Sequence, residues 1–424
     1  MGPEPFDPEA YLDSLQPIGW RLGLDRMHKL TSVLGMPQHR FASVHVVGTN
    51  GKSSVAQMIA ALLEAHGRSS GACLSPHLLR WSERVRLRGA EIEPQAFAAS
   101  VQRTAESAEV VNRTLDEGDA VTQFEAATAA AFVALANARV DAGVIEAGLG
   151  GRLDATNVIP SQVTVLTSIG LDHTEWLGET PLEIAAEKLA VLRDGSTLVT
   201  GALAPEIDEL AAASAAEHGA RHIRAPLDPG DGVTVRAPGA FQRRNFALAC
   251  AAAEAFLGRI DPQSVRQVAA EIVVPARLEL VAEDPPTILD VAHNADGAAA
   301  LAEALPEVSR ERPVFACIGI LAGKDAEAML AALAPVLEHA VLTELPAARL
   351  RASGRPGAES VSAHELAEIC ERLGLAHEVI EDPAAALARA RELAAQHGGV
   401  ALAAGSHYLL GAAWTRRHAQ SFSR

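Results

Sequence analysis

Short runs of β-branched residues alternate with longer stretches rich in alanine and leucine along most of the chain. The short runs predict strands, and the longer stretches predict helices with one apolar face. Because parallel strands need a crossover, which is usually a helix, this alternation favours an α/β fold with mostly parallel sheets covered by helices on both faces. The expected strands are residues 44–47, 144–145, 163–169, 197–200, 288–290, 314–320, 340–343 and 400–404. The expected helices are residues 55–66, 124–138, 298–305, 326–337 and 384–396.

The length of 424 residues is too great for one ordinary hydrophobic core, so we expect two domains. A helical stretch ends near residues 274–277, where Pro275 interrupts it, and a new series of strands and helices begins at Leu278. We therefore predict an N-terminal domain over residues 1–274 with a mostly parallel sheet. A smaller, Rossmann-like α/β domain is predicted over residues 275–424.

The composition narrows the class of protein further. A formal net charge of −17 argues against a nucleic-acid partner, because phosphate backbones are held by clustered Lys and Arg. The four cysteines are scattered without C-x-x-C spacing, which argues against disulfides and zinc and fits a reducing cytoplasm. Residues 1–11 lack the apolar core of a signal peptide, and the apolar stretches 126–138 and 399–414 are too short or too interrupted to span a bilayer. We expect a cytoplasmic protein without a membrane partner.

One loop carries the pattern of a phosphate-binding site. It lies between the expected strand 44–47 and the expected helix 55–66, and its residues are Gly48, Thr49, Asn50, Gly51, Lys52, Ser53 and Ser54. In such a loop the backbone N–H groups and the helix N-terminus converge on an anion, and the lysine reaches the outer phosphates. The hydroxyl of either Ser53 or Ser54 would approach Mg²⁺. The general phosphate-loop pattern has a glycine where Val46 stands, so a tight strand–helix turn is the alternative interpretation of the loop alone.

Polar residues at other strand ends and on one helix are further candidates. Glu146 ends an apolar strand at the edge where α/β sheets bind ligands, and its carboxylate suits magnesium, with a helix cap as the alternative. His173 follows the strand 163–169 and should face the same crevice, although a lone histidine is more often packed than ligating. Lys188 lies on a helix that begins near Pro181, where a solvated helix surface is the simplest interpretation.

The second domain has candidates of its own. Asp290, His293 and Asn294 cluster at the junction between the strand 288–290 and the next helix. Small-molecule sites concentrate at domain interfaces, which favours a binding role for these groups. Capping of the next helix by Asp290 or Asn294 is the alternative.

Several motifs follow one another in a fixed order over nearly the whole chain. They are G-T-N-G-K-S-S at 48–54, S-P-H-L at 75–78, E-R-V at 83–85, F-E at 124–125, I-E-A-G-L-G-G-R-L-D-A-T-N at 145–157, S-I-G-L-D-H-T-E-W-L-G at 168–178, E-K at 187–188, D-V-A-H-N at 290–294 and G-S-H-Y at 405–408. Together they resemble the folate branch of the Mur ligase family, the dihydrofolate synthase/folylpolyglutamate synthases. The stretches at 145–157 and 168–178 are the most specific.

The resemblance implies a carbon–nitrogen ligase that uses ATP. ATP would phosphorylate the carboxylate of a pteroate or folate to an acyl phosphate, and the amine of L-glutamate would then form an amide, with release of ADP and phosphate. The activation is needed because oxide is a poor leaving group, whereas phosphate leaves readily. Phosphoryl transfer itself depends on positioning and charge neutralisation. The resemblance assigns ATP binding to residues 1–274, a Mur-ligase central-type domain, and glutamate ligation to residues 275–424. We expect these small molecules as partners and a monomeric protein.

The resemblance also implies roles for residues of the first domain. Lys52 and the loop amides would hold the β- and γ-phosphates. Ser75, Glu146 and His173 would ligate one Mg²⁺. Lys188 matches a lysine that is carbamylated in the family, a change from cation to carboxylate that helps to hold a second Mg²⁺. The usual E-K-A-G reads E-K-L-A at 187–190, so this sequence departs from the pattern at its last two positions.

Contacts with the nucleotide and the other substrates complete the implied site. Asn245 and Arg277 resemble nucleotide contacts, although they stand in F-Q-R-R-N and P-A-R where H-Q-x-x-N and P-G-R are usual. The second-domain residues that match the family's glutamate-binding or ligation residues are Asp290, His293 and Ser406. The residues in the loop expected near the pterin-bearing substrate are Leu153, Asp154 and Asn157.

Two other functions share parts of this pattern. A cell-wall Mur ligase shares the phosphate loop but normally carries a separate N-terminal domain for a nucleotide sugar, and residues 1–47 leave room for only a short preface. A non-catalytic nucleotide-binding protein is disfavoured because Lys52, Glu146, His173 and Asp290 are all retained. Within the folate branch, dihydropteroate ligation and extension of the glutamate tail use the same machinery, and we expect both activities.

Overall fold

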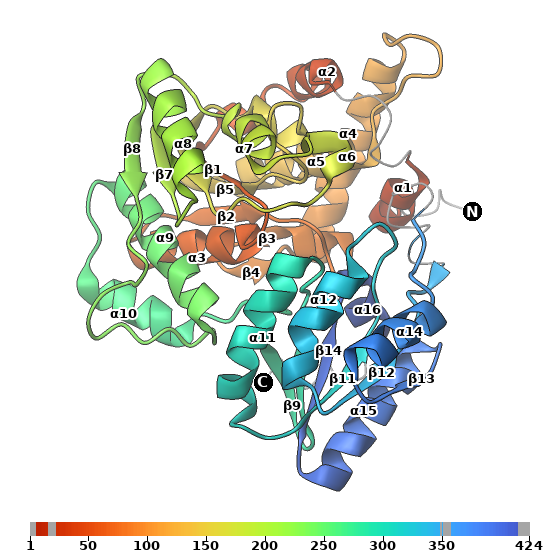
Figure 1. Cartoon of the computed structure of the whole chain (residues 1–424). Coiled ribbons are helices and arrows are strands. Elements are labelled where there is room, and N and C mark those ends of the chain that lie inside the picture. Colours follow the sequence, from red (N-terminus) through yellow and green to blue (C-terminus); the bar gives the residue numbers. More distant parts are fainter. Residues whose placement is uncertain (1–5, 16–22, 348–349, 351–357, 414–424) are drawn as a thin grey trace. The chain divides into compact units, whose positions relative to one another are not determined.

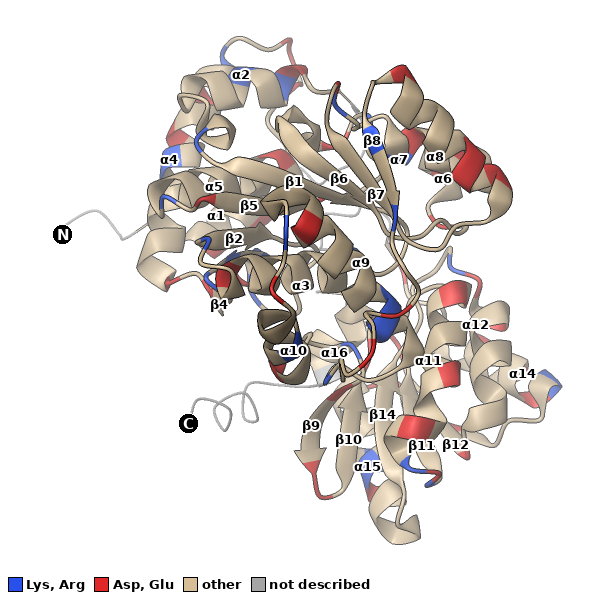
Figure 2. Ribbon diagram, turned by 90° about the vertical axis from the view of Figure 1, so that its left-hand side faces the viewer, with Lys and Arg blue, Asp and Glu red and all other residues tan. Residues whose placement is uncertain are grey.

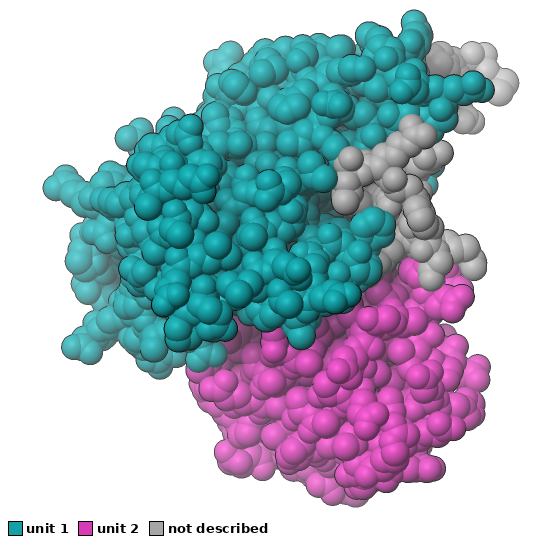
Figure 3. Space-filling model, turned by 45° about the horizontal axis from the view of Figure 1, so that its top comes forward, with its two compact units in different colours: residues 1–236, 242–272 teal, residues 237–241, 273–424 magenta. Residues whose placement is uncertain are grey.

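The computed structural model describes residues 6–15, 23–347, 350 and 358–413 (Figure 1). The chain forms two compact units, coloured separately in Figure 3. Unit 1 comprises Met1–Arg236 and Gln242–Ile272, and unit 2 comprises Ala237–Phe241 and Val273–Arg424. The assignment of ATP binding to one part and glutamate ligation to the other stays a prediction.

Unit 1 is built on an eight-stranded sheet in the order β4-β3-β2-β5-β1-β6-β7-β8. Its strands are β1 (Ala42–Val47), β2 (Ser70–Cys73), β3 (Val85–Leu87), β4 (Ala90–Glu91), β5 (Ala142–Glu146), β6 (Ser161–Leu166), β7 (Thr197–Thr200) and β8 (Arg221–Arg224). Neighbouring strands pair in parallel, except β2 with β3 and β3 with β4. The strand before the glycine-containing loop, β1, is therefore an interior strand, and it is buried from its second residue onward.

Helices pack on both sides of this sheet, and Figure 1 shows α3 and α5 on opposite sides of the strands. The helices are α1 (Pro8–Ser14), α2 (Asp25–Val33), α3 (Lys52–Ala65), α4 (Pro94–Asn112), α5 (Gln123–Asn137), α6 (Thr174–Leu177), α7 (Pro181–Leu189), α8 (Pro205–Glu217), α9 (Ala240–Leu257) and α10 (Pro262–Glu271), with short 3₁₀ turns η1 (Pro37–His39), η2 (Trp81–Arg84) and η3 (Ala155–Val158). One core cluster joins α1, α2, α4 and α5 to the sheet and includes Phe132 and Ile145. A second cluster lies under α7 and α8 and includes Val47, Leu166 and Leu189.

Unit 2 is built on a six-stranded sheet in the order β13-β12-β11-β14-β10-β9. Its strands are β9 (Glu279–Glu283), β10 (Pro286–Leu289), β11 (Val314–Ile318), β12 (His339–Leu342), β13 (His377–Val379) and β14 (Val400–Ala404), and its helices are α11 (Ala295–Ser309), α12 (Ala326–Leu333), α14 (Ala363–Leu373), α15 (Pro383–His397) and α16 (His407–Ala413), with the 3₁₀ turn η4 (Ala334–Val336). Only the edge strand β9 pairs antiparallel in this sheet. The central strands β11 and β14 are buried along their whole length.

The α/β class predicted from the alternation of strands and helices is confirmed by the two mostly parallel sheets. Strands β7 and β14 coincide with the expected ranges, whereas the strand expected at 163–169 ends at Leu166. Thr167 and Ser168 instead hydrogen-bond to the loop after β1. The β-branched pattern does not predict β2, β3, β4, β8, β9 and β13, which are short or rich in small and charged residues. In the described part of the chain, no helix has both the length and the apolar character needed to cross a bilayer.

Candidate active site

The strand order of unit 1 brings four of the sequence motifs to one edge of the sheet. In the pairing register, Val46 of β1 lies beside Glu146 of β5, and Val47 lies beside Leu166 of β6. On the far side of β5, Cys73 of β2 pairs with Ile145. The carboxyl ends of β2, β5, β1 and β6 therefore meet at the edge where parallel α/β sheets bind ligands.

The loop between β1 and α3 has a backbone that only glycine adopts without strain at two positions. Gly48 has a φ of 149° and Gly51, the N-cap of α3, has a φ of 83°. A Cβ on Gly48 would lie 1.9 Å from Thr167 Oγ1, so no larger residue fits there. Thr167 Oγ1 donates to the Asn50 carbonyl at 2.7 Å, and the Asn50 N–H donates to Ser168 Oγ at 3.0 Å. The residues that follow β6 therefore fix the conformation of this loop.

This supporting role of Thr167 and Ser168 was not among the sequence predictions. Ser168 begins the motif 168–178 and Thr167 directly precedes it, but within that region only His173 was a predicted site residue. The signal that could have revealed them is their position directly after a strand that ends beside the phosphate loop.

Lys52 and Asn245 both lie at this loop. Lys52 Nζ donates to the carbonyl oxygens of Gly48 at 3.1 Å and Thr49 at 3.0 Å, so its ammonium group folds back over the loop. Asn245 on α9 is so close to Gly51 that a Cβ there would be 2.8 Å from its Oδ1. The predicted phosphate and nucleotide contacts of unit 1 are therefore brought together.

The geometry distinguishes between the two serines of the loop. Ser53 Oγ donates to Glu146 Oε1 at 2.8 Å and lies 3.3 Å from the Ser75 carbonyl oxygen, and the Ser75 N–H donates to Glu146 Oε2 at 2.9 Å. Ser54 is buried, and its hydroxyl has no partner among the described residues. Hard oxygen donors are the ligands that Mg²⁺ prefers. The group formed by Ser53, Ser75 and the buried Glu146 carboxylate fits that ion, with the Ser53 hydroxyl in the better position.

His173 lies at the N-cap of α6 with a left-handed φ of 54°. Its side chain is 26% exposed, and its Nε2 lies 3.7 Å from Asp172 Oδ1. Among the described residues there is no group of three or more His, Cys, Asp and Glu side chains arranged to hold a metal. The predicted magnesium sites also draw on serine hydroxyls and a modified lysine, so they stay a prediction.

Lys188 is buried, unlike a lysine on a solvated helix surface. It is 4% exposed on α7, and the backbone of Gly151 packs so closely that a Cβ there would be 2.9 Å from its Cα. Burial, with a smaller contribution from the positive charge of Lys52 and against the opposing effect of Asp172, lowers the pKa of Lys188 to about 7. Its neighbour Glu187 pairs with Arg152 instead. Lys188 therefore lies within electrostatic reach of the phosphate loop as a partly neutral amine.

The loop after β5 uses most of its polar side chains internally. The Asp154 carboxylate accepts hydrogen bonds from the N–H groups of Leu149 and Thr156 at 2.8 and 2.9 Å. Burial raises the pKa of Asp154, and these hydrogen bonds oppose the rise. Asn157 is also buried and donates to the Arg152 carbonyl, whereas Leu153 is 38% exposed. Of the three residues predicted near the substrate, Leu153 is the one whose side chain reaches solvent.

Unit 2 forms a separate cluster at the carboxyl ends of β10 and β14, which are parallel neighbours. Asp290 is buried and accepts from the N–H groups of Leu278 and Ala292 at 2.9 and 2.8 Å. Burial raises the pKa of its carboxyl group, and the nearby Arg277 opposes this shift. Two further predicted residues lie in this region: His293 Nδ1 lies 2.9 Å from the Val291 carbonyl, and Ser406 Oγ accepts from Tyr408 N–H at 3.2 Å. Asn294 caps α11, as its alternative interpretation proposed.

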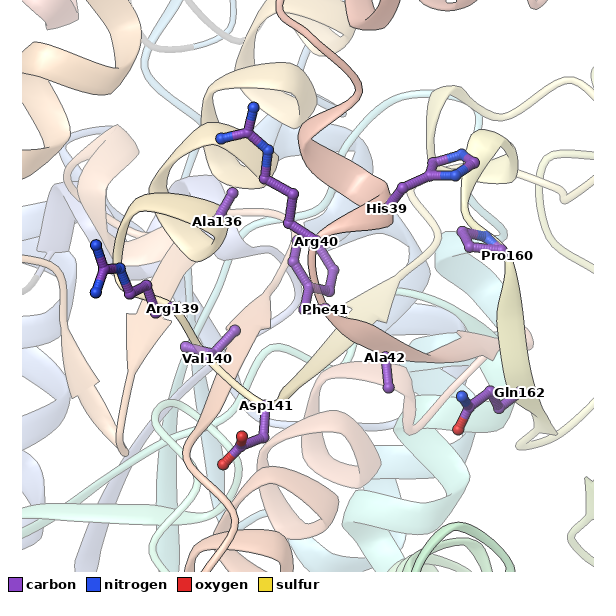
Figure 4. A pocket seen from close by; sticks show the side chains of 10 residues that line it. All are labelled: His39, Arg40, Phe41, Ala42, Ala136, Arg139, Val140, Asp141, Pro160 and Gln162. Atoms are coloured by element: carbon purple, nitrogen blue, oxygen red, sulfur yellow. The ribbon is translucent and has the colours of Figure 1, made fainter.

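A surface cavity of about 810 Å³ lies in unit 1, at the amino ends of β1, β5 and β6 (Figure 4). Its lining includes Arg40 and Phe41, which precede β1, and Arg139 and Asp141, which precede β5. None of the predicted site residues lines it. This cavity is therefore distinct from the candidate site at the carboxyl ends.

Comparison with known proteins identifies the family of this chain. The model of the Mur ligase glutamate ligase domain family matches residues 276–407. The dihydrofolate synthase/folylpolyglutamate synthase of Mycobacterium tuberculosis H37Rv is 34% identical over 408 residues, covering 85% of this chain and 83% of that protein. The phosphate loop, the acidic strand end and the second α/β unit together define the class of Mur-type ligases. This chain belongs to the dihydrofolate synthase/folylpolyglutamate synthase family within that class.

Solved structures of this family share the fold over nearly the full chain. The folylpolyglutamate synthase of M. tuberculosis complexed with ADP matches with a TM-score of 0.86 and 32% identity, over 98% of this chain and 97% of that chain. The bifunctional folylpolyglutamate synthase/dihydrofolate synthase of Yersinia pestis complexed with AMPPNP and Mn ion matches with a TM-score of 0.81 and 30% identity, over 97% and 98% of the two chains.

Proposed function

We propose that this chain is an ATP-dependent ligase that joins L-glutamate to dihydropteroate and to reduced folates through an acyl phosphate. The observation that carries the proposal is the cluster at the carboxyl ends of the unit 1 strands. There Ser53 and Ser75 both bond to Glu146, beside a loop whose Lys52 lies within electrostatic reach of the buried Lys188. Relatives were solved in complex with ADP and with AMPPNP and Mn ion, which supports a nucleotide and a divalent cation as ligands of this chain.

The nucleotide would be held by the loop after β1. The N–H groups of residues 48–54 and the start of α3 offer donors to phosphate oxygens. Lys52 would exchange its present carbonyl partners for the β- and γ-phosphates, which are stronger acceptors because they are charged. Asn245, beside Gly51, would contact the nucleotide, and Arg277 is proposed as a further nucleotide contact.

Ser53, Ser75, Glu146 and His173 would hold one Mg²⁺. The ion supplies neutralisation of the charge on the transferred phosphoryl group. A second Mg²⁺ would use a carbamylated Lys188. Because the pKa of Lys188 is lowered to about 7, a large fraction of its amine is neutral near pH 7 and can attack CO₂. The N–C bond forms, one proton leaves, and the repulsion between Lys52 and Lys188 becomes an attraction.

The reaction then proceeds in two displacements. A carboxylate oxygen of the pteroate or folate attacks the γ-phosphorus, and the bond to the ADP oxygen breaks. The neutral amine of glutamate attacks the acyl carbon, phosphate leaves with the C–O electron pair, and the amine loses a proton. Asp290, His293 and Ser406 would bind glutamate or support this second step, and the loop with Leu153, Asp154 and Asn157 would lie near the pterin. We expect a monomer with small-molecule partners and no nucleic-acid partner.

The test is a product assay with each acceptor offered separately. The purified chain is incubated with ATP, Mg²⁺, L-glutamate and either dihydropteroate or a reduced folate, and phosphate release and glutamylated product are measured. We expect both acceptors to gain one glutamate with one phosphate released per product. Reactions without an acceptor should release little phosphate. Failure with both acceptors would contradict the proposed function, and activity with one alone would restrict it to that substrate.

A further inference from the structure

A fully buried histidine connects the strand before the phosphate loop to the loop after β5. His45 lies on β1 with no exposed surface, and its Nε2 is 2.9 Å from Thr156 Oγ1. Its Nδ1 is buried without a hydrogen-bond partner among the described residues. A buried polar atom left unpaired destabilises a fold, so packing alone does not account for a histidine here.

The direction of the hydrogen bonds assigns the proton on the ring. Thr156 Oγ1 donates its hydrogen to Asp154 Oδ1 at 2.5 Å, so it can only accept from His45. His45 must therefore carry its proton on Nε2, an assignment that follows from the network. Burial, with a smaller contribution from Arg193, lowers the pKa of His45 to about 3. The ring is neutral at physiological pH and has one proton to donate.

The hydrogen bonds from His45 to Thr156 and from Thr156 to Asp154 form a chain, called here the relay. Asp154, its last member, holds two parts of the loop after β5 together. Its carboxylate also accepts from the backbone N–H groups of Leu149 and Thr156, on either side of it in the sequence. The same loop packs on α7, where a Cβ on Gly151 would lie 2.7 Å from the Glu187 carbonyl oxygen. The exposed Leu153 directly precedes Asp154. The orientation of the carboxylate thus fixes the backbone that presents Leu153.

We propose that His45 is a positioning residue for the pterin-bearing acceptor, because it orients Asp154 through Thr156 and thereby fixes the loop 147–157. This inference rests on the proposed function, since it takes that loop as part of the acceptor site. The phosphate loop is held by Thr167 and Ser168, which take no part in the relay. Loss of the relay should therefore weaken binding of the acceptor and leave binding of ATP nearly unchanged.

Two substitutions of the same residue separate the relay from packing. The amide nitrogen of glutamine can replace Nε2 of histidine, whereas that of asparagine falls near Nδ1. We expect His45→Asn to raise the KM for the acceptor by about tenfold, the factor expected for loss of one buried hydrogen bond. His45→Gln should stay within about threefold of the natural chain, and the KM for ATP should change by less than about twofold in both. Thr156→Val should behave as His45→Asn. The packing control is Val44→Ala, a cavity in the same buried strand.

A second measurement does not depend on activity. Hydrogen exchange at the Leu149 and Thr156 amides reports whether the Asp154 carboxylate still holds the loop. We expect faster exchange in His45→Asn and Thr156→Val, but not in His45→Gln or Val44→Ala. If the natural chain ligates neither acceptor, the proposed function fails. If it ligates normally while the acceptor KM of His45→Asn is unchanged, or rises together with the ATP KM, the positioning role is overturned and the proposed function stands.

Discussion

The ammonium group of Lys52 lies over the phosphate loop, within 3.1 Å of two loop carbonyl oxygens. In the proposed reaction this ammonium group would stabilise the negative charge that develops on the transferred phosphoryl group. Removing one such donor typically lowers kcat by about 10²–10³-fold. We therefore expect Lys52→Ala to lose ATP-dependent ligation by that factor, measured as product formation, while its circular dichroism spectrum is unchanged. Lys29→Ala is the matched control, because Lys29 is exposed and, among the described residues, its side chain bonds to the Thr114 carbonyl alone, far from the phosphate loop in the sequence. Near-normal turnover in Lys52→Ala would contradict the mechanism.

Lys188 gives a prediction that depends on pH. Only a neutral amine reacts with CO₂, and the neutral fraction of an amine with a pKa of about 7 rises as pH increases through 7 and is nearly complete above about 8. The protein stripped of CO₂ should therefore regain activity faster at pH 8 than at pH 6, at equal dissolved CO₂, with no further gain at pH 9. An ordinary lysine would show a gain that continues toward pH 10. Lys188→Ala should show no response to CO₂, and ¹³C NMR with labelled CO₂ should detect a carbamate only in the natural chain. A rate that keeps rising above pH 9 would argue against the lowered pKa.

Residue identity could be predicted from the sequence better than residue environment. The motif 48–54 names both Ser53 and Ser54, but their distinction depends on a carboxylate far away in the sequence, Glu146, and on which side of α3 each hydroxyl faces. Likewise, the simplest interpretation of Lys188 was a solvated helix surface, because the sequence does not show that Lys188 is buried or that Gly151 of the loop after β5 packs on its backbone. Such contacts arise only when the parallel strands are brought side by side.

At the scale of elements, helix α3 lies between two glycines that have nearly the same positive φ. Gly51 precedes the helix with a φ of +83° and Gly67 follows it with a φ of +75°. Alanine at either position should destabilise the fold by about 1 kcal/mol, the cost of a left-handed φ. Only at Gly51 would the added Cβ also displace Asn245, whereas nothing lies within 4 Å at Gly67.

We therefore expect Gly51→Ala to raise the KM for ATP by about tenfold or more, as loss of a directional contact would. Gly67→Ala should lower the thermal midpoint to a similar extent and leave that KM unchanged. Thermal melts and ATP titrations of the two variants provide the comparison. Equal effects on ATP would indicate that backbone strain, and not the approach of Asn245, limits the site.

Elements with strong periodicity were predictable, and those that depend on their neighbours were not. Strands β7 and β14 carry clear apolar runs and match the expected ranges. Strand β2 reads Ser-Gly-Ala-Cys without a β-branched residue, and it becomes a strand because it pairs with both β5 and β3. The position of β1 between β5 and β6 is also a tertiary property. That order is what brings Glu146 and Thr167 to the phosphate loop.

For the whole molecule, the distribution of charge agrees with small, anionic substrates held at local sites. The helices α8, α11 and α12 carry acidic residues and, over their described lengths, no Lys or Arg (Figure 2). An acidic protein can still bind a triphosphate, because one loop, one lysine and a metal supply the charge locally. The negative net charge thus argues against a nucleic-acid partner, but it does not argue against the proposed reaction.

Helix α9 provides a test of how the chain is divided between its two units. The helix begins with Ala240 and Phe241, which belong to unit 2, and continues through Phe246 in unit 1. Phe241 is half-buried against the core cluster of unit 2, whereas Phe246 is fully buried. The apolar pattern of the sequence does not reveal this change, because both phenylalanines lie on one uninterrupted helix.

Each substitution should therefore destabilise a different sheet. We expect Phe246→Ala to destabilise unit 1 by about 3–5 kcal/mol, as is usual for a buried phenylalanine, and Phe241→Ala to destabilise unit 2 by less, since its ring is only half-buried. Native-state hydrogen exchange resolves the two cases, because β1 and β6 report on unit 1 while β11 and β14 report on unit 2. Faster exchange of β11 and β14 in Phe241→Ala, with β1 and β6 unchanged, would show that the segment 237–241 stabilises unit 2, although unit 1 precedes and follows it in the sequence. Faster exchange of β1 and β6, with β11 and β14 unchanged, would instead assign the segment 237–241 to unit 1. The two units would then have a single boundary in the sequence, after residue 272.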